Sequence, residues 1–400
     1  MKNNVPSKWS IKNISEIANT SSGGTPSRSN IQFYTNGIYP WVKTGELGNK
    51  YLYDAEEYIT EDAINNSSAK LIEKNSVIMA MYGATIGKMS INKVEVTTNQ
   101  ACCSISCNKN IYNYEFLYYI LSLQKENIIK LGAGGAQPNI SQEIIKRYKI
   151  LCPPLEEQDK IAEILSTWDL AIEKQEQLIE KKKESKKGLM QNLYSKGTKK
   201  EKLVKSKLGE VPESWNIVKA KEVFKSVSIK NNENEELLSV TQDKGTIPRS
   251  QLEGNVVMPE GSTRGYKLVV PNNFIISLRS FQGGLEISKH RGIISPAYTV
   301  LENKIEICHD YFKYYFKKEE FISRLNGAIV GIRDGKQISY ADFGEMFLPV
   351  PSLEEQIKIA EILMVADKEI ELLEKELEVL KLQKKGLMQR LLTGEVRVKV

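Results

Sequence analysis

PPLEEQDKIAEIL, at residues 153–165, returns as PSLEEQIKIAEIL at residues 351–363. From position 153 onward, twelve of seventeen residues match the residues 198 positions later. The same offset relates KKGLMQ at 186–191 to KKGLMQ at 384–389. A gapless repeat of this length in a 400-residue chain indicates a duplicated module, and it decides how the rest of the sequence is divided.

A weaker repeat opens each half of the chain. VPSKWSI at 5–11 resembles VPESWNI at 211–217, now with an offset of 206 residues. Between these openings and the repeated Ile-Ser at 140–141 and 338–339, the two halves share no convincing identity. Each half therefore has a shared opening, a divergent body and a shared tail. This arrangement suggests two versions of one module that read different targets.

The shared tails are expected to be long helices. Residues 160–193 contain no proline and a single glycine, and apolar side chains recur at heptad positions a and d over about five heptads. The acidic LEEQ segment suits the positive end of a helix dipole. The residues placed on this seam are Ile161, Leu165, Trp168, Ile172, Ile179 and Leu189 in the first tail, and Ile359, Leu363, Ala366, Ile370, Leu373, Leu377, Leu380 and Leu387 in the second.

Two packing partners are open to each helix: the other helix, or the body of its own half. A narrow a/d stripe suits a helical partner better than a sheet, so we expect the two helices to pair antiparallel.

The bodies read as mixed α/β. Apolar and β-branched runs at 76–99 and 274–288 are strand-like and are broken by glycine turns. Residues 112–131 and 309–325 each read as one helix. A basic stretch at 195–210 is interpreted as a solvated linker rather than a phosphate site.

The fold class is therefore α+β, with two mixed α/β domains related by a pseudo-two-fold and separated by two long helices that form an antiparallel coiled coil. The expected domains are residues 1–152, helix 153–198, linker and second domain 199–350, and helix 351–400.

Composition is that of a globular protein, with 41% hydrophobic and 26% charged residues. The net charge of +6 permits a polyanionic partner without requiring one. No apolar run approaches the roughly 20 residues that cross a bilayer, and no signal peptide is recognisable, so no membrane partner is expected. Five irregularly spaced cysteines fit reduced thiols in the cytoplasm.

A search for catalytic motifs finds none. The two histidines, His290 and His309, lack neighbours in metal-ligand spacing. GATIGKM at 83–89 is one residue short of a phosphate loop and ends in methionine where Ser or Thr would hold magnesium. We therefore expect no catalytic residue, no metal and no cofactor on this chain.

The sequence nevertheless resembles the specificity subunits of type I restriction-modification systems. The resemblance covers nearly the whole chain. The segments that carry it are the opening VPSKWSIKNISEIANTSSGGTPSR, IYPWVKTGEL at 38–47, GAQPNIS at 135–141, the doubled PPLEEQ…IAEIL…KKGLMQ, and LLTGEVRV at 391–398.

The resemblance implies a DNA-recognition subunit with two target-recognition domains, each binding one half of a split sequence in double-stranded DNA. Two paired helices, conserved in the family, hold these domains apart and set the spacer. Two methyltransferase subunits dock around them and use S-adenosylmethionine, and restriction subunits that need ATP and Mg can join. The second half departs from the pattern: it lacks the Gly-Gly-Thr-Pro and Pro-Trp marks, and its loop reads GIRDGKQIS at 331–339.

Arginine can read guanine, Asn and Gln can read adenine, and lysine holds phosphate. On this basis the residues expected at DNA are Thr25, Ser27, Arg28, Tyr82, Lys88, Gln137 and Asn139 in the first domain, and Arg264, Arg279, Gln282, Arg291, Arg333, Lys336 and Gln337 in the second. Trp41 and Trp215 are assigned to packing. Two rivals stay open: a coiled-coil scaffold that joins two protein partners without sequence-specific DNA binding, and a fused nuclease or methyltransferase.

Overall fold

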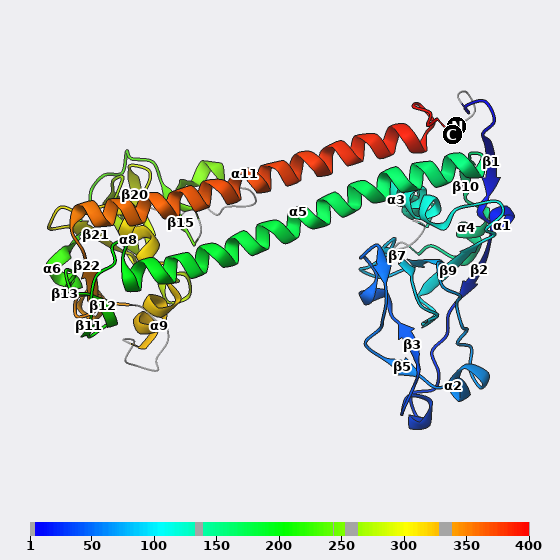
Figure 1. Ribbon diagram of the computed structural model, residues 1–400, viewed down its shortest axis with the longest axis horizontal. Helices are drawn as coiled ribbons and strands as arrows, with labels where there is room; N and C mark the ends of the chain where they lie inside the picture. The colour runs from blue at the N-terminus through cyan, green and yellow to red at the C-terminus, as the bar shows by residue number, and fades with distance from the viewer. Residues whose placement is uncertain (1–4, 133–138, 243, 253–262, 328–337, 400) are drawn as a thin grey trace. The chain divides into compact units, whose positions relative to one another are not determined.

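The computed structural model describes residues 5–132, 139–242, 244–252, 263–327 and 338–399 (Figure 1). The chain divides into two compact units. The first comprises residues 1–176 and 376–400, and the second comprises residues 177–375. Each unit therefore contains one body together with part of each long helix.

The body of the first unit is built around a five-stranded sheet. Its strand order is β2 (Ala18–Ser22), β9 (Cys102–Cys107), β6 (Val77–Ala80), β7 (Met89–Asn92) and β4 (Tyr51–Leu52). A three-stranded sheet follows the order β5 (Tyr58–Ile59), β3 (Tyr39–Val42) and β8 (Thr97–Thr98), and β1 (Ser10–Asn13) pairs antiparallel with β10 (Lys149–Cys152). The helices of this body are α1 (Ile14–Ile17), α2 (Glu61–Asn65), α3 (Tyr114–Leu131) and α4 (Gln142–Arg147), with 3₁₀ turns at Ile31–Phe33 and Thr44–Glu46.

Helix α3 forms where the sequence predicts it. The Asn113 side chain accepts hydrogen bonds from the backbone N–H groups of Glu115 and Phe116, which satisfies donors that the first turn leaves free. Phe116 and Ile120 are buried at helical spacing, in one apolar core with Val77 of β6 and Ile161 of the long helix α5 (Leu155–Lys196). The first core thus joins sheet, α3 and long helix.

The body of the second unit has a four-stranded sheet in the order β14 (Phe224–Val227), β21 (Thr299–Asn303), β18 (Phe274–Ile276) and β19 (Glu286–Ile287). Four strand pairs surround it: β11 (Leu203–Ser206) with β12 (Gly209–Pro212), β13 (Asn216–Lys219) with β22 (Phe347–Val350), β15 (Leu238–Thr241) with β16 (Gly245–Pro248), and β17 (Lys267–Val269) with β20 (Gly292–Ile294). Its helices are α6 (Ala220–Val223), α7 (Ser280–Gly283), α8 (His309–Tyr315), α9 (Glu319–Gly327) and α10 (Tyr340–Gly344), with a 3₁₀ turn at Arg249–Gln251.

The repeat in the sequence is a repeat in the structure. The run β1–α1–β2 recurs as β13–α6–β14. The strand β10, which follows α4, pairs with β1, and β22, which follows α10, pairs with β13. The repeated Ile-Ser is a helix start. Ser141 accepts from the N–H of Ile144 to begin α4, and Ser339 accepts from the N–H of Asp342 to begin α10.

The repeated LEEQ also has a structural explanation. The amide of Gln158 donates to Pro153 O at 2.8 Å and accepts from the N–H of Asn113 at 2.9 Å. Gln356 makes the same two contacts, to Pro351 O and from the N–H of Cys308, both at 2.9 Å. The buried glutamine therefore fastens the start of each long helix to the helix of its own body.

The long helices are α5 (Leu155–Lys196) and α11 (Leu353–Leu392), and they pair antiparallel in both units. In the first unit Glu176 meets Lys381 at 2.9 Å, and in the second Lys183 meets Glu374 at the same distance. All fourteen side chains that the heptad pattern placed on the seam are buried or half-buried.

Three local expectations were wrong. The segment 309–325 is two helices, because the chain turns at residues 316–318, where Phe316 is buried. Gly284 passes so close to this turn that a Cβ would lie 1.9 Å from Phe316 O. The strand-like run at 274–288 contains the short helix α7, and the supposed linker at 195–210 is partly the β11–β12 hairpin.

Candidate nucleic-acid interface

Four loops that are distant in the sequence meet at one edge of the first body. The N–H of Gly24 donates to Thr98 O at 2.9 Å, the N–H of Met81 to Ala101 O at 2.8 Å, and the N–H of Ile140 to Met81 O at 2.8 Å. Backbone hydrogen bonds therefore join the loops at residues 23–28, 81–88, 98–101 and 139–141.

The Gly-Gly of the first loop is needed for this approach. A Cβ on Gly23 would lie 2.1 Å from Thr98 O, and one on Gly24 would lie 2.2 Å from the Ser68 hydroxyl. The buried Trp41 also donates its Nε1–H to Gly24 O at 3.0 Å. Trp41 thus packs and anchors the loop, in agreement with its assignment to packing; Trp215 is likewise buried.

Several of the residues predicted to contact DNA in the first body lie on these joined loops. Tyr82 is exposed and forms an antiparallel bridge with the exposed Asn139. Thr25 donates its hydroxyl to Gln100 Oε1 at 2.6 Å, which brings in a glutamine that the sequence reasoning missed. Lys88 is exposed at the end of the same β6–β7 turn. A ring hydroxyl, two amides and an ammonium group can form both base and phosphate contacts here.

The arginine predicted to contact DNA in the first body is already engaged. Arg28 forms an ion pair with Glu57 at 2.6 Å and lies over the rings of Tyr34 and Trp41. Hydrogen bonds from Arg28 and Lys43 lower the pKa of Glu57 to about 2. The neighbouring Ser27 hydroxyl is hydrogen-bonded to Ser29 at 2.8 Å. Arg28 would have to leave Glu57, or share it, to reach DNA.

In the second body, the predicted residues separate into two kinds. Arg264 pairs with Glu233 at 3.5 Å and Arg291 with Glu235 at 2.8 Å. Arg279, directly before α7, has no ion pair with any described residue, and Gln282 lies within α7; both are exposed, as are Arg264 and Arg291. Gln282 accepts a hydrogen bond from Gln242 at 3.4 Å, so the β15–β16 turn lies next to α7. Gln137, Arg333, Lys336 and Gln337 lie outside the described residues.

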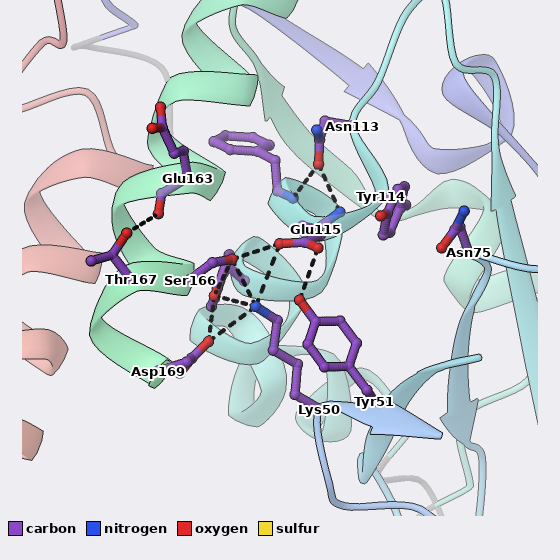
Figure 2. A network of polar contacts seen from close by, with 12 residues as sticks. Lys50, Tyr51, Asn75, Asn113, Tyr114, Glu115, Glu163, Ser166, Thr167 and Asp169 are labelled. Carbon is purple, nitrogen blue, oxygen red and sulfur yellow. Dashed lines mark hydrogen bonds and ion pairs between the residues drawn. The ribbon is translucent and has the colours of Figure 1, made fainter. Parts of the chain in front are cut away.

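Lys50 fastens the first body to the long helix, as Figure 2 shows. Its half-buried ammonium group lies 3.4 Å from Glu115 of α3 and 3.1 Å from Asp169 of α5, and it donates to Ser166 at 2.9 Å. Tyr51 donates its hydroxyl to Glu115 at 2.9 Å. Sequence reasoning missed this network because no local pattern links its members.

The network keeps both of its carboxyl groups ionised. Burial would raise the pKa of Glu115, but the Ser166 hydrogen bond and the charge of Lys50 outweigh it and hold that pKa below its ordinary value. Burial acts in the same way on Asp169, and hydrogen bonds from Lys384 and Tyr119 again leave its pKa lowered.

The described part of the chain offers little for other kinds of site. Among those residues, no three His, Cys, Asp or Glu side chains are grouped so that they could hold a metal ion. No described helix has the length and apolarity that a membrane span needs. Burial raises the pKa of the Cys102, Cys103 and Cys107 thiols to about 12, so these thiols lack nucleophilic character.

The sequence profile of the family described as "Type I restriction modification DNA specificity domain" matches residues 6–181 and, a second time, residues 212–382. The two matches fall on the two repeated halves.

Proteins with similar sequences are described as specificity subunits of type I restriction enzymes. The MjaVIII type I restriction enzyme specificity subunit of Methanocaldococcus jannaschii is 28% identical over 415 aligned positions, covering 99% of this chain and 94% of that protein. The putative MjaX specificity subunit of the same organism is 33% identical over 304 positions, covering 73% and 70%. The crystal structure of the HsdS subunit from Thermoanaerobacter tengcongensis superposes with a TM-score of 0.54 over 99% of both chains, at 17% identity, which is a likeness of fold.

Proposed function

Because the chain belongs to the family of type I restriction-modification DNA specificity domains, we propose that it is the DNA-recognition subunit of a type I restriction-modification complex. Each unit then reads one half of a bipartite site in double-stranded DNA. The observation that carries this proposal is a repeated frame that holds two different sets of exposed polar side chains, Tyr82 and Asn139 in one body and Arg279 and Gln282 in the other.

The chemistry belongs to other subunits in this proposal. Two methyltransferase subunits dock on this chain and bring S-adenosylmethionine, and restriction subunits, where they join, bring ATP and Mg. This chain is non-catalytic, binds no cofactor and works in the cytoplasm. Its contribution is to place the methyltransferases at a chosen sequence, which requires contacts to base edges and to phosphates but no reacting group.

The paired helices act as a ruler in this proposal. A two-helix rod is stiff, whereas a flexible linker would let the half-sites vary in separation. The spacer between the half-sites is therefore a property of α5 and α11 and not of the bodies.

The test is a body exchange read by methylome sequencing. Residues 1–152 are replaced by the corresponding body of another family member, and the hybrid is expressed with its methyltransferase subunits in cells without other adenine methylation. We expect one half-site of the methylated motif to change, with the other half-site and the spacer kept. A change in both half-sites contradicts independent reading by the two units.

The same experiment addresses the scaffold alternative. A coiled-coil scaffold without sequence-specific binding predicts that the methylated motif does not depend on this chain at all. A matched assay of the purified chain alone with S-adenosylmethionine and duplex DNA should show no methyl transfer, and activity there would reject the non-catalytic role.

A further inference from the structure

A pocket of about 550 Å³ lies within the second unit, where the long helices meet α8 and the β15–β16 turn. Its lining includes the apolar side chains Met190, Leu285, Ile287 and Ile370. Its wall carries three lysines of α5, two from α8 and the residues after it, and Lys244 and Lys289 from loops of the body. The charge of this pocket therefore depends on how many of these lysines have a carboxylate partner.

Five of the seven lysines already have a carboxylate partner. Those of α5 pair with residues of α9 and α11, for example Lys183 with Glu374 at 2.9 Å. Lys313 pairs with Asp310 at 3.2 Å, and Lys317 pairs with the buried Glu286. These five lysines therefore contribute little uncompensated charge to the pocket.

The other two lysines differ from these five. The ammonium groups of Lys244 and Lys289 make no hydrogen bond or ion pair with any described residue, and both side chains are exposed. Among the lysines that line the pocket, the uncompensated charge thus lies on these two exposed side chains. A small anion within the pocket would also be near the carboxylates of Glu286 and Asp367, which would repel it, whereas a large anion lying across the exposed loops can reach Lys244 and Lys289.

Hydrogen bonds hold the loops that carry these two lysines near Gln282, one of the residues predicted to contact DNA. Lys317 donates to Gln242 O and to Gly283 O, both at 2.8 Å, which ties the β15–β16 turn to the end of α7. Gln242 also donates to Gln282 at 3.4 Å, and the N–H of Lys289 donates to the Thr246 hydroxyl at 3.3 Å. The ammonium groups of Lys244 and Lys289 and the exposed Gln282 therefore lie on loops that these hydrogen bonds hold together.

The junction in the first unit is built differently. There Lys50 joins the contact between Tyr119, Asp169 and Lys384, because it donates to the Tyr119 hydroxyl at 2.6 Å and pairs with Asp169 at 3.1 Å. In the second unit the matching contact between Tyr314, Asp367 and Lys186 borders the open pocket.

We propose that Lys244 and Lys289 are phosphate contacts that hold the duplex backbone beside the half-site read by the second unit. This inference rests on the proposed function and assigns the two lysines affinity without sequence information. Contacts of this kind act equally on every sequence and weaken with salt, since each phosphate contact releases bound counterions.

The experiment uses the complete complex with its methyltransferase subunits and the double variant Lys244→Gln/Lys289→Gln. Affinity is measured from 50 to 200 mM salt for the duplex that methylome mapping identifies and for a duplex with scrambled half-sites. Removing two phosphate contacts should reduce the slope of log K against log salt by about 1.8 and weaken binding by up to about 60-fold at 0.1 M salt. Both duplexes should be affected equally, and the methylated motif should not change.

The matched control is Lys205→Gln/Lys207→Gln on the β11–β12 hairpin, which removes the same charge from exposed positions of the same unit. It should leave the slope unchanged. An unaltered slope in the Lys244 and Lys289 variant, an equal change in the control, or a loss confined to the specific duplex overturns the assignment. So does saturable binding of free ATP that depends on the two lysines and competes with DNA, since the ligand is then a small molecule.

The two levels of failure are distinguishable. A wild-type complex that does not discriminate the mapped duplex from the scrambled one contradicts the proposed function itself. A complex that discriminates normally, with a variant that keeps the wild-type slope, contradicts only the phosphate assignment.

Discussion

Two aspartates at equivalent positions of the repeat should differ in how much they stabilise their units. Asp169 contacts Lys384, Lys50 and the Tyr119 hydroxyl, and its side chain is 27% exposed. Asp367 contacts Lys186 and the Tyr314 hydroxyl, and its side chain is 42% exposed. The chain therefore supplies its own matched pair: Asp169→Asn and Asp367→Asn make the same chemical change in two environments.

The magnitudes follow from burial and from the number of cations left behind. Breaking a fully buried ion pair costs about 3–5 kcal/mol, and breaking an exposed pair costs about 0–1 kcal/mol. Asp169 is closer to the buried case. Its replacement leaves two half-buried lysines, although Lys50 still has Glu115 as a partner, so we expect the free energy of unfolding of the first unit to fall by about 2–3 kcal/mol. Asp367 is closer to the exposed case, so we expect the free energy of unfolding of the second unit to fall by about 1 kcal/mol.

The assay must report on each unit separately, because two units need not unfold as one. Native-state hydrogen exchange read on peptides does this, since local opening has its own free energy. In Asp169→Asn, protection of α3 and the first half of α5 should fall by about 30- to 150-fold, with α8 unchanged. In Asp367→Asn, protection of α8 should fall by about fivefold, with α3 unchanged.

A double-mutant cycle with Lys384→Met separates the ion pair from the other effects. The coupling between Asp169→Asn and Lys384→Met should be at least about 1 kcal/mol, because the two side chains are in direct contact. Equal losses for the two aspartate variants, or no coupling in the cycle, would refute the view that the Lys50 network makes the first unit's junction the stronger one.

Three further outcomes are expected. Insertion of one turn, four residues, after both Glu176 and Lys375 keeps the contacts within each unit and should lengthen the spacer in the methylome by one or two base pairs, with both half-sites unchanged; an unaltered spacer contradicts the ruler. The pKa values of Glu115 and Asp169 are held below 4.5 and 3.8, against the effect of burial, by their hydrogen bonds and neighbouring cations. Such groups stabilise the fold at neutral pH, and this contribution is lost as pH falls through about 4.5 and lower, so α3 should lose exchange protection there; constant protection from pH 7 to 3 would count against it. Finally, with a thiol pKa of about 12, Cys103 is thiolate in only about 1 molecule in 10,000 at pH 8, so the native protein should leave it unlabelled by a disulfide reagent that labels it in denaturant.

The parts of the fold that the sequence predicts are those with a local period. The seam of α5 and α11 follows from a heptad, whereas the repeated Ile-Ser indicates only a duplication, and the structure shows that its serine caps α4. The break at residues 316–318 has no glycine or proline signal, because it is fixed by contacts with residues more than 30 positions away, such as Gln242 and Gly283.

In the candidate site, too, some features can be predicted from the sequence and others only from the fold. Residue type suggests that an arginine can read a base, but only the fold shows that Glu57 faces Arg28 and that Glu235 faces Arg291. Conversely, Lys244 and Lys289 carry no motif; they stand out because their ammonium groups have no partner among the described residues, whereas the other five lysines that line the same pocket have one.

The duplication itself explains why the helices pair antiparallel. Residues 155–176 of α5 contain seven acidic and two basic side chains, whereas residues 177–196 contain two acidic and six basic ones. α11 repeats this order, with seven acidic and three basic side chains in 353–375 and two acidic and four basic ones in 376–392. A parallel, in-register pair would set each charge against its own copy, such as Asp169 against Asp367, and like charges repel.

The antiparallel pair sets each acidic half against a basic half instead. Asp169 then meets Lys384, and its copy meets Lys186, the copy of that lysine, so one interaction is made twice from a single repeated sequence. The same order also places acids at the positive end of each helix dipole and bases at the negative end. A helix with segregated charge, once duplicated, thus specifies the direction of its own partner, and the bodies are left free to diverge in what they bind.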